Sequence, residues 1–560
     1  MKSNIILEYK RSDKKFNSLD TIDSTFFHSF VKAFFTDYNV STSSDSTIEL
    51  FNEFKSDYLS FVKFLRNIVT KDSKTLEFLK NLTMEDKLEY LAIINDLFDF
   101  WRNKRRFLIL ENVENGENPQ QLIVFFNYFN SFVESFYRLI YETIYCRYQT
   151  NYRELPAGCN AALLTNIFKY KLPDDLEFLN DVRGVEAVVT RPPFMFNSEQ
   201  NTRKGTFFTK DLKISKDQIK GDQFLSVMVK VNHKRGLVVL NKDFLYYLPA
   251  MANLFEIDVP KVDEVVDFVV LFGIDNLNEK PYYYMDDGVY VGVLPTMSQI
   301  DYFGYLKKMI LTLFNLGQID HQNLPIHGSA VQITLKNGES YNLCFLGDSG
   351  AGKSETLEAI KNLHNPMIKS LKTIFDDMGT FFIKDNDVVM SGTEIGAFVR
   401  VDDLDKGYPL RSVDRAIYMN IDETNSRTII PIVDYRSTCK KYHVDYFFLV
   451  NNFVDSEVGL EQFLDENVAL SEFKKGERKA KGTTDEIGLV STYFANPFGP
   501  LQKEADVEKF INNYFDLLYK NKVFVGRLYS KLSLDPVNGP KLAAKSIIEQ
   551  LSNRDTYSKM

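Results

Sequence analysis

Residues 347–354 read Gly-Asp-Ser-Gly-Ala-Gly-Lys-Ser and match the pattern G-x-x-x-x-G-K-[ST] at every fixed position. The apolar run 343–346 before it predicts a strand, and the segment 354–363 after it has the apolar spacing of a helix. Glycines in such a turn let consecutive backbone N–H groups curl around an anion, and the helix N-terminus adds partial positive charge. The sequence therefore predicts a phosphate-binding loop between a strand and a helix.

This loop gives the predicted nucleotide site, with ATP and Mg²⁺ as the expected ligands. Lys353 should reach the β- and γ-phosphates, and the Ser354 hydroxyl should bind Mg²⁺. The full predicted nucleotide-binding set is Gly347, Asp348, Ser349, Gly350, Ala351, Gly352, Lys353 and Ser354.

Magnesium prefers hard oxygen ligands, so a nucleotide site of this kind needs carboxylates nearby. Asp376 and Asp377 follow the β-like run 371–375 and are the candidates. The alternative is that the two acids only form a turn before Gly379.

Composition limits the remaining possibilities. The chain has 560 residues, 44% hydrophobic and 26% charged, which is ordinary for a globular protein of about three or four domains. A net charge of −9 gives no basic excess for nucleic acid. The four cysteines show neither zinc-site nor disulfide spacing, so a cytoplasmic location is expected. No apolar run reaches 18 residues, so no membrane span is expected.

Four regions are expected along the chain. Residues 1–150 predict an all-helical domain, with aromatic stripes as its core in 47–70, 84–110 and 120–148. A mixed α/β domain is expected over 151–325, a P-loop domain over 326–500 and an α/β tail over 501–560. The basic run 474–481 is expected to be a solvated loop.

From about residue 302 to 496, roughly a third of the chain, the order of motifs resembles that of the ATP-dependent phosphoenolpyruvate carboxykinases. The resemblance implies an α+β, mixed α/β core of two domains with the active cleft between them. It also makes 476–484 a candidate lid. The residues that carry it are Tyr302, Lys307-Lys308, His327-Gly328-Ser329-Ala330, the phosphate loop, Asp376-Asp377, Thr424-Asn425-Ser426-Arg427 with Pro431, and Ala480-Lys481-Gly482-Thr483.

The resemblance implies a role for each matching position. Lys308, His327 and Asp377 would be ligands of a transition metal, usually Mn²⁺, and Asp376 would lie near the nucleotide Mg²⁺. Arg427 would contact both the γ-phosphate and a small carboxylate substrate, and Tyr302 would lie in the substrate pocket. Arg191, in a segment similar to the family's T-G-R-S-P, would grip the substrate carboxylate. The implied catalytic set is Lys308, Lys353, Asp376 and Arg427.

Three functions remain open. The first is the carboxykinase reaction, in which oxaloacetate and ATP give phosphoenolpyruvate, ADP and CO₂; it predicts that Arg191, Tyr302 and Arg427 converge. The second is a kinase for a protein serine or a small hydroxyl compound, because the string GDSGAGKSE also resembles the loop of HPr kinase/phosphorylase. Asp376 or Asp377 would then be a general base. The third is an ATP-dependent regulator that binds a protein partner through its helical N-terminal region.

Overall fold

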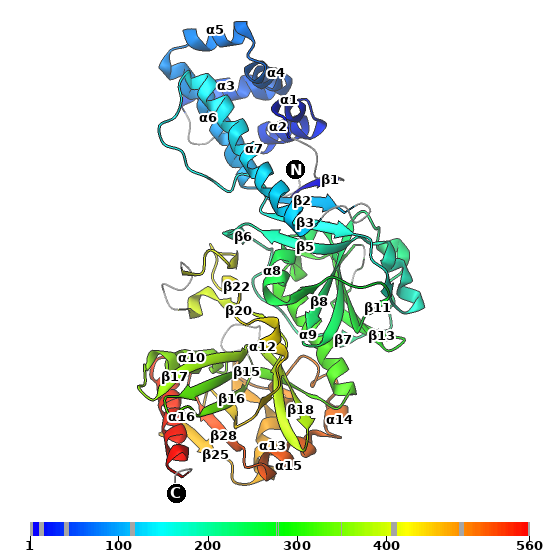
Figure 1. The fold of residues 1–560 in the computed structure, drawn as a ribbon, viewed down its shortest axis with the longest axis vertical. Helices are drawn as coiled ribbons and strands as arrows, with labels where there is room; N and C mark the ends of the chain where they lie inside the picture. The colour runs from blue at the N-terminus through cyan, green and yellow to red at the C-terminus, as the bar shows by residue number, and fades with distance from the viewer. Residues whose placement is uncertain are drawn as a thin grey trace. The chain divides into compact units, whose positions relative to one another are not determined.

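A computed structural model shows the fold of the chain (Figure 1). It describes residues 4–9, 16–38, 44–112, 118–275, 277, 279–348, 350–404, 411–480 and 487–557. The chain divides into two compact units, the first made of Met1–Asn166 and Val185–Arg191 and the second of Ile167–Gly184 and Pro192–Met560. The mixed α/β class and the helical N-terminal region are confirmed, whereas the predicted boundaries near residues 150, 325 and 500 stay predictions.

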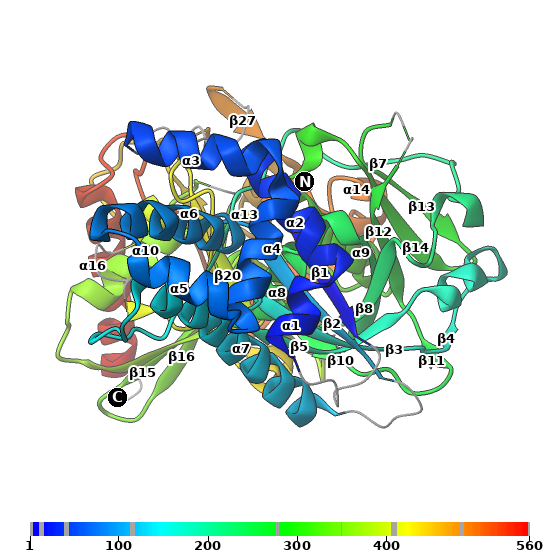
Figure 2. The same ribbon diagram turned by 90° about the horizontal axis from the view of Figure 1, so that it is seen from above.

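Capped amphipathic helices make up most of the first unit. Side chains such as Ser24 and Ser44 accept hydrogen bonds from the first free N–H groups of α2 and α3, and Thr83 and Asn118 form capping boxes that begin α6 and α7. In the view of Figure 2 these helices lie close to one another. They are α1 (Ser18–Ile22), α2 (Thr25–Asp37), α3 (Asp45–Ser56), α4 (Tyr58–Val69), α5 (Ser73–Asn81), α6 (Met84–Arg102) and α7 (Pro119–Tyr145).

The first unit also contains strands that the sequence pattern did not predict, so the all-helical expectation is wrong for residues 4–9 and 105–111. β1 (Asn4–Tyr9) pairs in parallel with β2 (Arg105–Glu111), and β2 pairs in parallel with β3 (Ala161–Asn166). β2 is buried almost throughout. A short apolar run that is buried on both faces has the same apolar pattern as a buried helix, which is why 105–110 was read as part of a helix.

Aromatic side chains fill the core of the first unit, as the stripe in 47–70 predicts. Phe51, Phe54, Phe61 and Leu65 are all buried there. Tilted and edge-on ring pairs predominate in it, including Phe35 against Phe61 with ring centroids 5.2 Å apart.

Buried Arg106 ties β2 to the segment after α7. Its guanidinium donates hydrogen bonds to the carbonyl oxygens of Gly158 (2.7 Å) and Trp101 (2.8 Å), and its side chain lies against the Trp101 ring. Burial lowers the pKa of Arg106 to about 10, so the residue stays charged at neutral pH. The Trp101 indole N–H donates to the Ala157 carbonyl oxygen at 2.6 Å, which fixes the same segment from the other side.

The second unit contains two large sheets. One runs in the order β8-β9-β12-β14-β13-β7, and the other in the order β23-β19-β18-β15-β16-β24-β28-β25, with β17 also pairing β15. The first set of strands is β7 (Phe208–Thr209), β8 (Phe224–Val231), β9 (Lys234–Asn241), β12 (Phe268–Ile274), β13 (Tyr282–Asp286) and β14 (Val289–Pro295). The second is β15 (Leu324–Leu335), β16 (Ser340–Leu346), β17 (Ile368–Phe375), β18 (Met378–Lys384), β19 (Asp387–Gly392), β23 (Tyr442–His443), β24 (Tyr446–Asn451), β25 (Leu460–Gln462) and β28 (Phe524–Tyr529).

Two helices matter most for the site in this unit. Helix α9 (Phe303–Asp320) packs against β14 and β15, so it contacts both large sheets, and nearly all of its residues are buried. Helix α10 (Lys353–Asn362) follows the phosphate loop and packs against α16 (Asn538–Tyr557). The expected helix over 354–363 is thereby confirmed.

A smaller sheet runs in the order β20-β22-β21-β6. Its strands are β6 (Phe194–Phe196), β20 (Gly396–Arg400), β21 (Ile417–Met419) and β22 (Arg427–Pro431), and α8 (Tyr247–Leu254) packs against β22. The segments that complete the second unit are β4 (Tyr170–Lys171), β10 (Glu256–Asp258), β11 (Glu264–Val265), α12 (Tyr435–Cys439), α13 (Glu466–Lys475), β26 (Glu477–Lys479), β27 (Leu489–Ser491), α14 (Glu504–Val507) and α15 (Ile511–Lys520). Within the described part of the chain, no helix has both the length and the apolar character needed to cross a bilayer.

The burial of Arg106 leads to a stability prediction. Arg106→Met removes the donors from several buried carbonyl oxygens, so we expect it to lower the free energy of unfolding by about 2–4 kcal/mol. Trp101 is the only tryptophan, and its fluorescence during urea unfolding reports this unit selectively. Arg66→Met is the matched control, because the Arg66–Asp23 pair is solvent-exposed and should contribute less than about 1 kcal/mol. Equal losses in both variants would contradict the prediction.

Candidate active site

The phosphate loop has the strand–turn–helix geometry that the sequence predicts. Strand β16 ends at Leu346, and α10 begins at Lys353. Gly350 and Gly352 have φ values of 79° and 102°, in the left-handed region that favours glycine. A Cβ atom on Gly352 would also lie 2.4 Å from the Ser530 hydroxyl oxygen. Ser349 lies outside the described residues.

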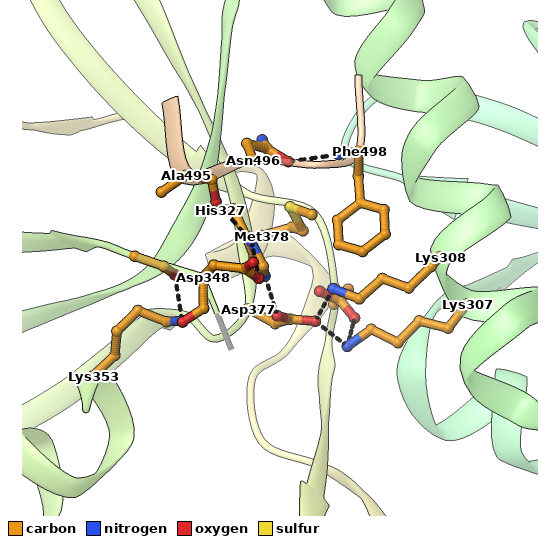
Figure 3. Close-up of polar contacts among 12 residues, drawn as sticks. Lys307, Lys308, His327, Asp348, Lys353, Asp377, Met378, Ala495, Asn496 and Phe498 are labelled. Carbon is orange, nitrogen blue, oxygen red and sulfur yellow. Dashed lines mark hydrogen bonds and ion pairs between the residues drawn. The ribbon is translucent and has the colours of Figure 1, made fainter. Parts of the chain in front are cut away.

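Lys353 lies across its own loop. Its ammonium donates hydrogen bonds to the carbonyl oxygens of Gly347 (2.5 Å) and Asp348 (3.2 Å), and the side chain is buried (Figure 3). These contacts hold the positive charge at the mouth of the loop, between the strand end and the first turn of α10.

A cavity of about 450 Å³ in the second unit brings most of the predicted site together. This volume falls in the range of small-molecule sites. Gly347, Ala351 and Arg191 do not line it. The predicted residues that do line it are Tyr302, Lys308, His327, Asp348, Gly350, Gly352, Lys353, Ser354, Asp376, Asp377 and Arg427.

Backbone hydrogen bonds position His327 between the phosphate loop and the paired aspartates. The His327 carbonyl oxygen accepts from the Gly347 N–H, and the Gly328 N–H donates to the Asp377 carbonyl oxygen, both at 3.0 Å. Strand β15, which carries His327, pairs with β16 on one side and with β18 on the other. The pairing therefore brings His327 close to the end of β16, where the phosphate loop begins, and to the turn between β17 and β18, which carries the two aspartates.

The Asp377 carboxylate collects three side chains (Figure 3). Its Oδ2 atom accepts hydrogen bonds from the ammonium groups of Lys307 (2.5 Å) and Lys308 (2.7 Å), and its Oδ1 atom lies 3.1 Å from Nε2 of His327. Lys307 and Lys308 are neighbours in the first turns of α9. The cluster thus joins α9 to the turn between β17 and β18.

Glu394 is a buried carboxylate of this cluster that the sequence pattern did not identify. It lies 2.9 Å from the Lys307 ammonium, which therefore sits between Glu394 and Asp377. Burial would lower the pKa of Lys307, but these two carboxylates outweigh it and raise the pKa above its usual value. Burial raises the pKa of Glu394 to about 7. Lys307 is therefore a structural cation, while Lys308 faces the cavity.

The protonation states around Asp377 differ from those in water. Burial lowers the pKa of Lys308 to about 8. Burial and the charge of Lys308 lower the pKa of His327, so the imidazole is neutral. Burial alone would raise the pKa of Asp377, but Lys307 and Lys308 hold it well below its usual range. Burial and the charge of Asp377 raise the pKa of Asp376.

The donor set of Lys308, His327 and Asp377 fits a divalent cation. The Nδ1 atom of His327 lies 3.1 Å from the Ala495 carbonyl oxygen, so we assign the proton of the neutral ring to Nδ1. The Nε2 atom faces an oxygen of the Asp377 carboxylate at 3.1 Å. Imidazole and carboxylate groups bind divalent transition metals. Lys308 would join them only as the free amine, and its pKa of about 8 brings that form closer to neutral pH.

Among the described residues, no three or more His, Cys, Asp and Glu side chains are grouped so that they could hold a metal ion. Lys308, His327 and Asp377 include only two residues of these types. The assignment of a metal to them stays a prediction.

Asp348 is held by Arg478, which belongs to the basic run 474–481. The guanidinium donates to Asp348 Oδ2 from Nε (3.0 Å) and from Nη2 (2.8 Å), and both side chains are buried. The expectation of a solvated loop is therefore wrong for Arg478, because its charge is paired inside the protein. Gly476 ends α13 and Arg478 lies on β26, which pairs with β27, whereas residues 481–484 of the candidate lid lie outside the described residues.

The segment 494–498 closes the other side of the histidine and was not predicted from the sequence. Phe494 and Ala495 have φ values of 51° and 47°, which are strained for these residue types. The Phe498 ring lies edge-on to His327, and the Lys308 ammonium lies over it at 4.3 Å. The strained turn thus aims one carbonyl group and one ring at the two predicted metal ligands.

Arg427 and Tyr302 face the same cavity. Arg427 lies on β22, its guanidinium lies 5.4 Å from the Phe398 ring, and its buried Nε has no hydrogen-bond partner. Tyr302 caps α9 and also packs against Phe398. Arg203 lines the cavity as well and lies over Phe498, although no motif pointed to it. The wall opposite the phosphate loop is therefore cationic and aromatic.

Arg191 belongs to the first unit, unlike the other predicted site residues. Its guanidinium donates to the Asn127 side-chain oxygen at 2.8 Å and lies 4.7 Å from the Phe126 ring. The match to T-G-R-S-P did not predict the contact between Arg191 and the Phe126 ring. The convergence of Arg191 with Tyr302 and Arg427 stays a prediction.

Comparison with protein-family models gives no match to the chain. Comparison with curated proteins gives no significant match either. Assignment of a function therefore rests on the residues and geometry of the site.

The left-handed conformation of Gly352 predicts a selective loss of nucleotide binding. Gly352→Ala adds a Cβ atom at a strained φ and against Ser530, so we expect ATP affinity, measured by calorimetry, to fall by at least about tenfold. Gly317→Ala is the matched control, because Gly317 lies inside α9 and a Cβ atom there meets nothing within 4 Å. Undiminished binding in Gly352→Ala would show that this turn does not hold the nucleotide.

The Asp348–Arg478 pair predicts a non-additive pair of substitutions. Arg478→Met leaves a carboxylate buried beside the loop, and we expect a loss of about 3–5 kcal/mol in the free energy of unfolding. Adding Asp348→Leu removes that charge and should restore most of the loss. Urea unfolding of both single variants and the double variant measures the coupling; additive losses would contradict a direct pair.

Proposed function

We propose that the chain is an ATP-dependent phosphoryl-transfer enzyme with a carboxykinase-like core and reaction. The observation that carries the proposal is that one cavity is lined by Lys353 and Ser354 of the phosphate loop, by the Lys308–His327–Asp377 cluster and by Arg427. Phosphoryl transfer needs positioned cations and hydrogen-bond donors around the transferred group more than it needs covalent chemistry.

Each side of the cavity has a distinct role in this proposal. The loop N–H groups, Lys353 and Ser354 hold the triphosphate and its Mg²⁺, and Asp376 supports that Mg²⁺. Arg427 offers an unpartnered Nε to the γ-phosphate or to a substrate carboxylate, which are the groups that guanidinium binds best.

Lys308, His327 and Asp377 would hold Mn²⁺. When bound there, the metal supplies positive charge that stabilises an enolate oxygen. Phe498 and Tyr302 limit the access of water to this side of the cavity. The acceptor that matches these groups best is a small carboxylate that forms an enolate, as oxaloacetate does on losing CO₂.

ATP consumption with oxaloacetate tests the proposal. We expect ADP formation to depend on both oxaloacetate and Mn²⁺, because the cavity combines a carboxylate-binding arginine with a transition-metal donor set. Lys353→Ala and Arg427→Met should each lower turnover by at least about 100-fold. Lys369→Met, an exposed lysine on β17, is the matched control and should retain activity. ATP consumption that ignores oxaloacetate would overturn the carboxykinase assignment.

A kinase for a hydroxyl acceptor is the second candidate, and one observation favours it. Burial and Asp377 raise the pKa of Asp376 beside the loop, which is the tuning that a general base for a hydroxyl proton needs. This reaction would transfer ³²P from ATP to a serine peptide or a small alcohol without oxaloacetate. Loss of that transfer in Asp376→Asn, with ATP binding retained, would support it.

A further inference from the structure

The first unit contains its own cavity, of about 510 Å³. The cavity is partly open at the surface, unlike a closed void within a core. Its volume is similar to that of sites that hold a complete small molecule. All of its lining residues belong to the first unit, so it is separate from the phosphate loop.

Aromatic and aliphatic side chains make up most of the wall. Trp101 and Leu97 of α6, Phe30 of α2, and Phe132 and Phe136 of α7 all line it. The Trp101 indole N–H and the Tyr137 hydroxyl are directed elsewhere, to the Ala157 carbonyl oxygen and to Asn95. Rings whose polar atoms are already paired present apolar faces to the cavity.

Among the described lining residues other than Tyr9 and Tyr137, the polar side chains lie on α1 and at the N-caps of α1 and α2. They are Asn17, Asp20, Thr21 and Ser24. Asn17 and Ser24 cap helices, and the Thr21 hydroxyl bonds back to the Asn17 carbonyl oxygen. None of the described lining residues is a lysine, arginine or histidine. Among the described lining residues the only charged side chain is Asp20, which would repel an anionic group.

We propose that this cavity is a binding site for a small, neutral, largely apolar molecule with an aromatic or polycyclic body. Its volume fits a compact molecule, its rings fit flat apolar surfaces, and its charges disfavour an anion. The site is independent of the nucleotide cavity and would stand even if the phosphoryl-transfer proposal failed.

Trp101 makes the proposal directly testable, because the only tryptophan of the chain lines the cavity. The probe is N-phenyl-1-naphthylamine, a neutral fluorophore that absorbs at the wavelengths of tryptophan emission. Titration into the full-length protein should give saturable binding with one probe per chain and quench Trp101 by energy transfer. The anionic probe 1-anilinonaphthalene-8-sulfonate should bind at least about tenfold more weakly.

Two phenylalanine variants on one helix separate this site from non-specific binding. Val133→Phe fills part of the cavity from α7 and should weaken binding of the neutral probe by at least about tenfold. Val124→Phe makes the same change on an exposed face of α7 and should leave binding unchanged. Thr21→Leu narrows the cavity from α1 and should act like Val133→Phe, so the test survives if one variant fails to fold. Non-saturable binding, tighter binding of the anion, or equal effects of Val133→Phe and Val124→Phe would overturn the proposal.

Discussion

The arrangement of the cavity beside the phosphate loop depends on the interactions of the Asp377 carboxylate. This carboxylate receives two ammonium groups from α9 and faces His327 from β15, so one side chain joins a helix, a strand and the turn after β17. Two buried lysines next to each other would repel strongly without it. The second carboxylate, Glu394, balances Lys307 from behind, which leaves Lys308 with the lowered pKa and the position facing the cavity.

Main-chain strand pairing sets the positions of the phosphate loop, His327 and the paired aspartates. Strand β15 pairs with the strand that leads into the phosphate loop and with the strand that follows the paired aspartates. A shift of one residue in either pairing would turn His327 to the opposite face of the sheet. Gly328 is required at this point, because a Cβ atom there would lie 2.2 Å from the Phe345 carbonyl oxygen. The sheet register therefore sets the separation between the loop and the carboxylates.

The sequence predicted those parts of the site that depend on local pattern. The phosphate loop has a short-range signal in its glycines and in the apolar strand and helix that flank it, and the structure confirms both flanking elements. Lys308 and His327 were expected at the site from the resemblance, and the structure brings them to one cavity with the loop. Arg478, Glu394 and Phe498 escaped prediction because their roles arise from contacts distant in sequence. Strand β2 was missed for a different reason. It is buried on both faces, so its sequence lacks the alternation of apolar and polar residues that marks a half-buried strand.

The two cavities differ in the charge of their lining: charged side chains line the cavity beside the phosphate loop, and mostly apolar side chains line the cavity of the first unit. Around the phosphate loop, Lys308 pairs with the Asp377 carboxylate, and Lys353 and Arg427 add positive charge to the lining of the same cavity. In the first unit, the wall is formed by rings whose polar atoms are bonded to the backbone or to amides, so it discriminates by shape and by excluding charge. A phosphate placed in the apolar cavity would lose its hydration without gaining a charged partner. A neutral aromatic molecule placed beside the phosphate loop would displace water from charged side chains without pairing with them. The two proposed sites would therefore take different ligands.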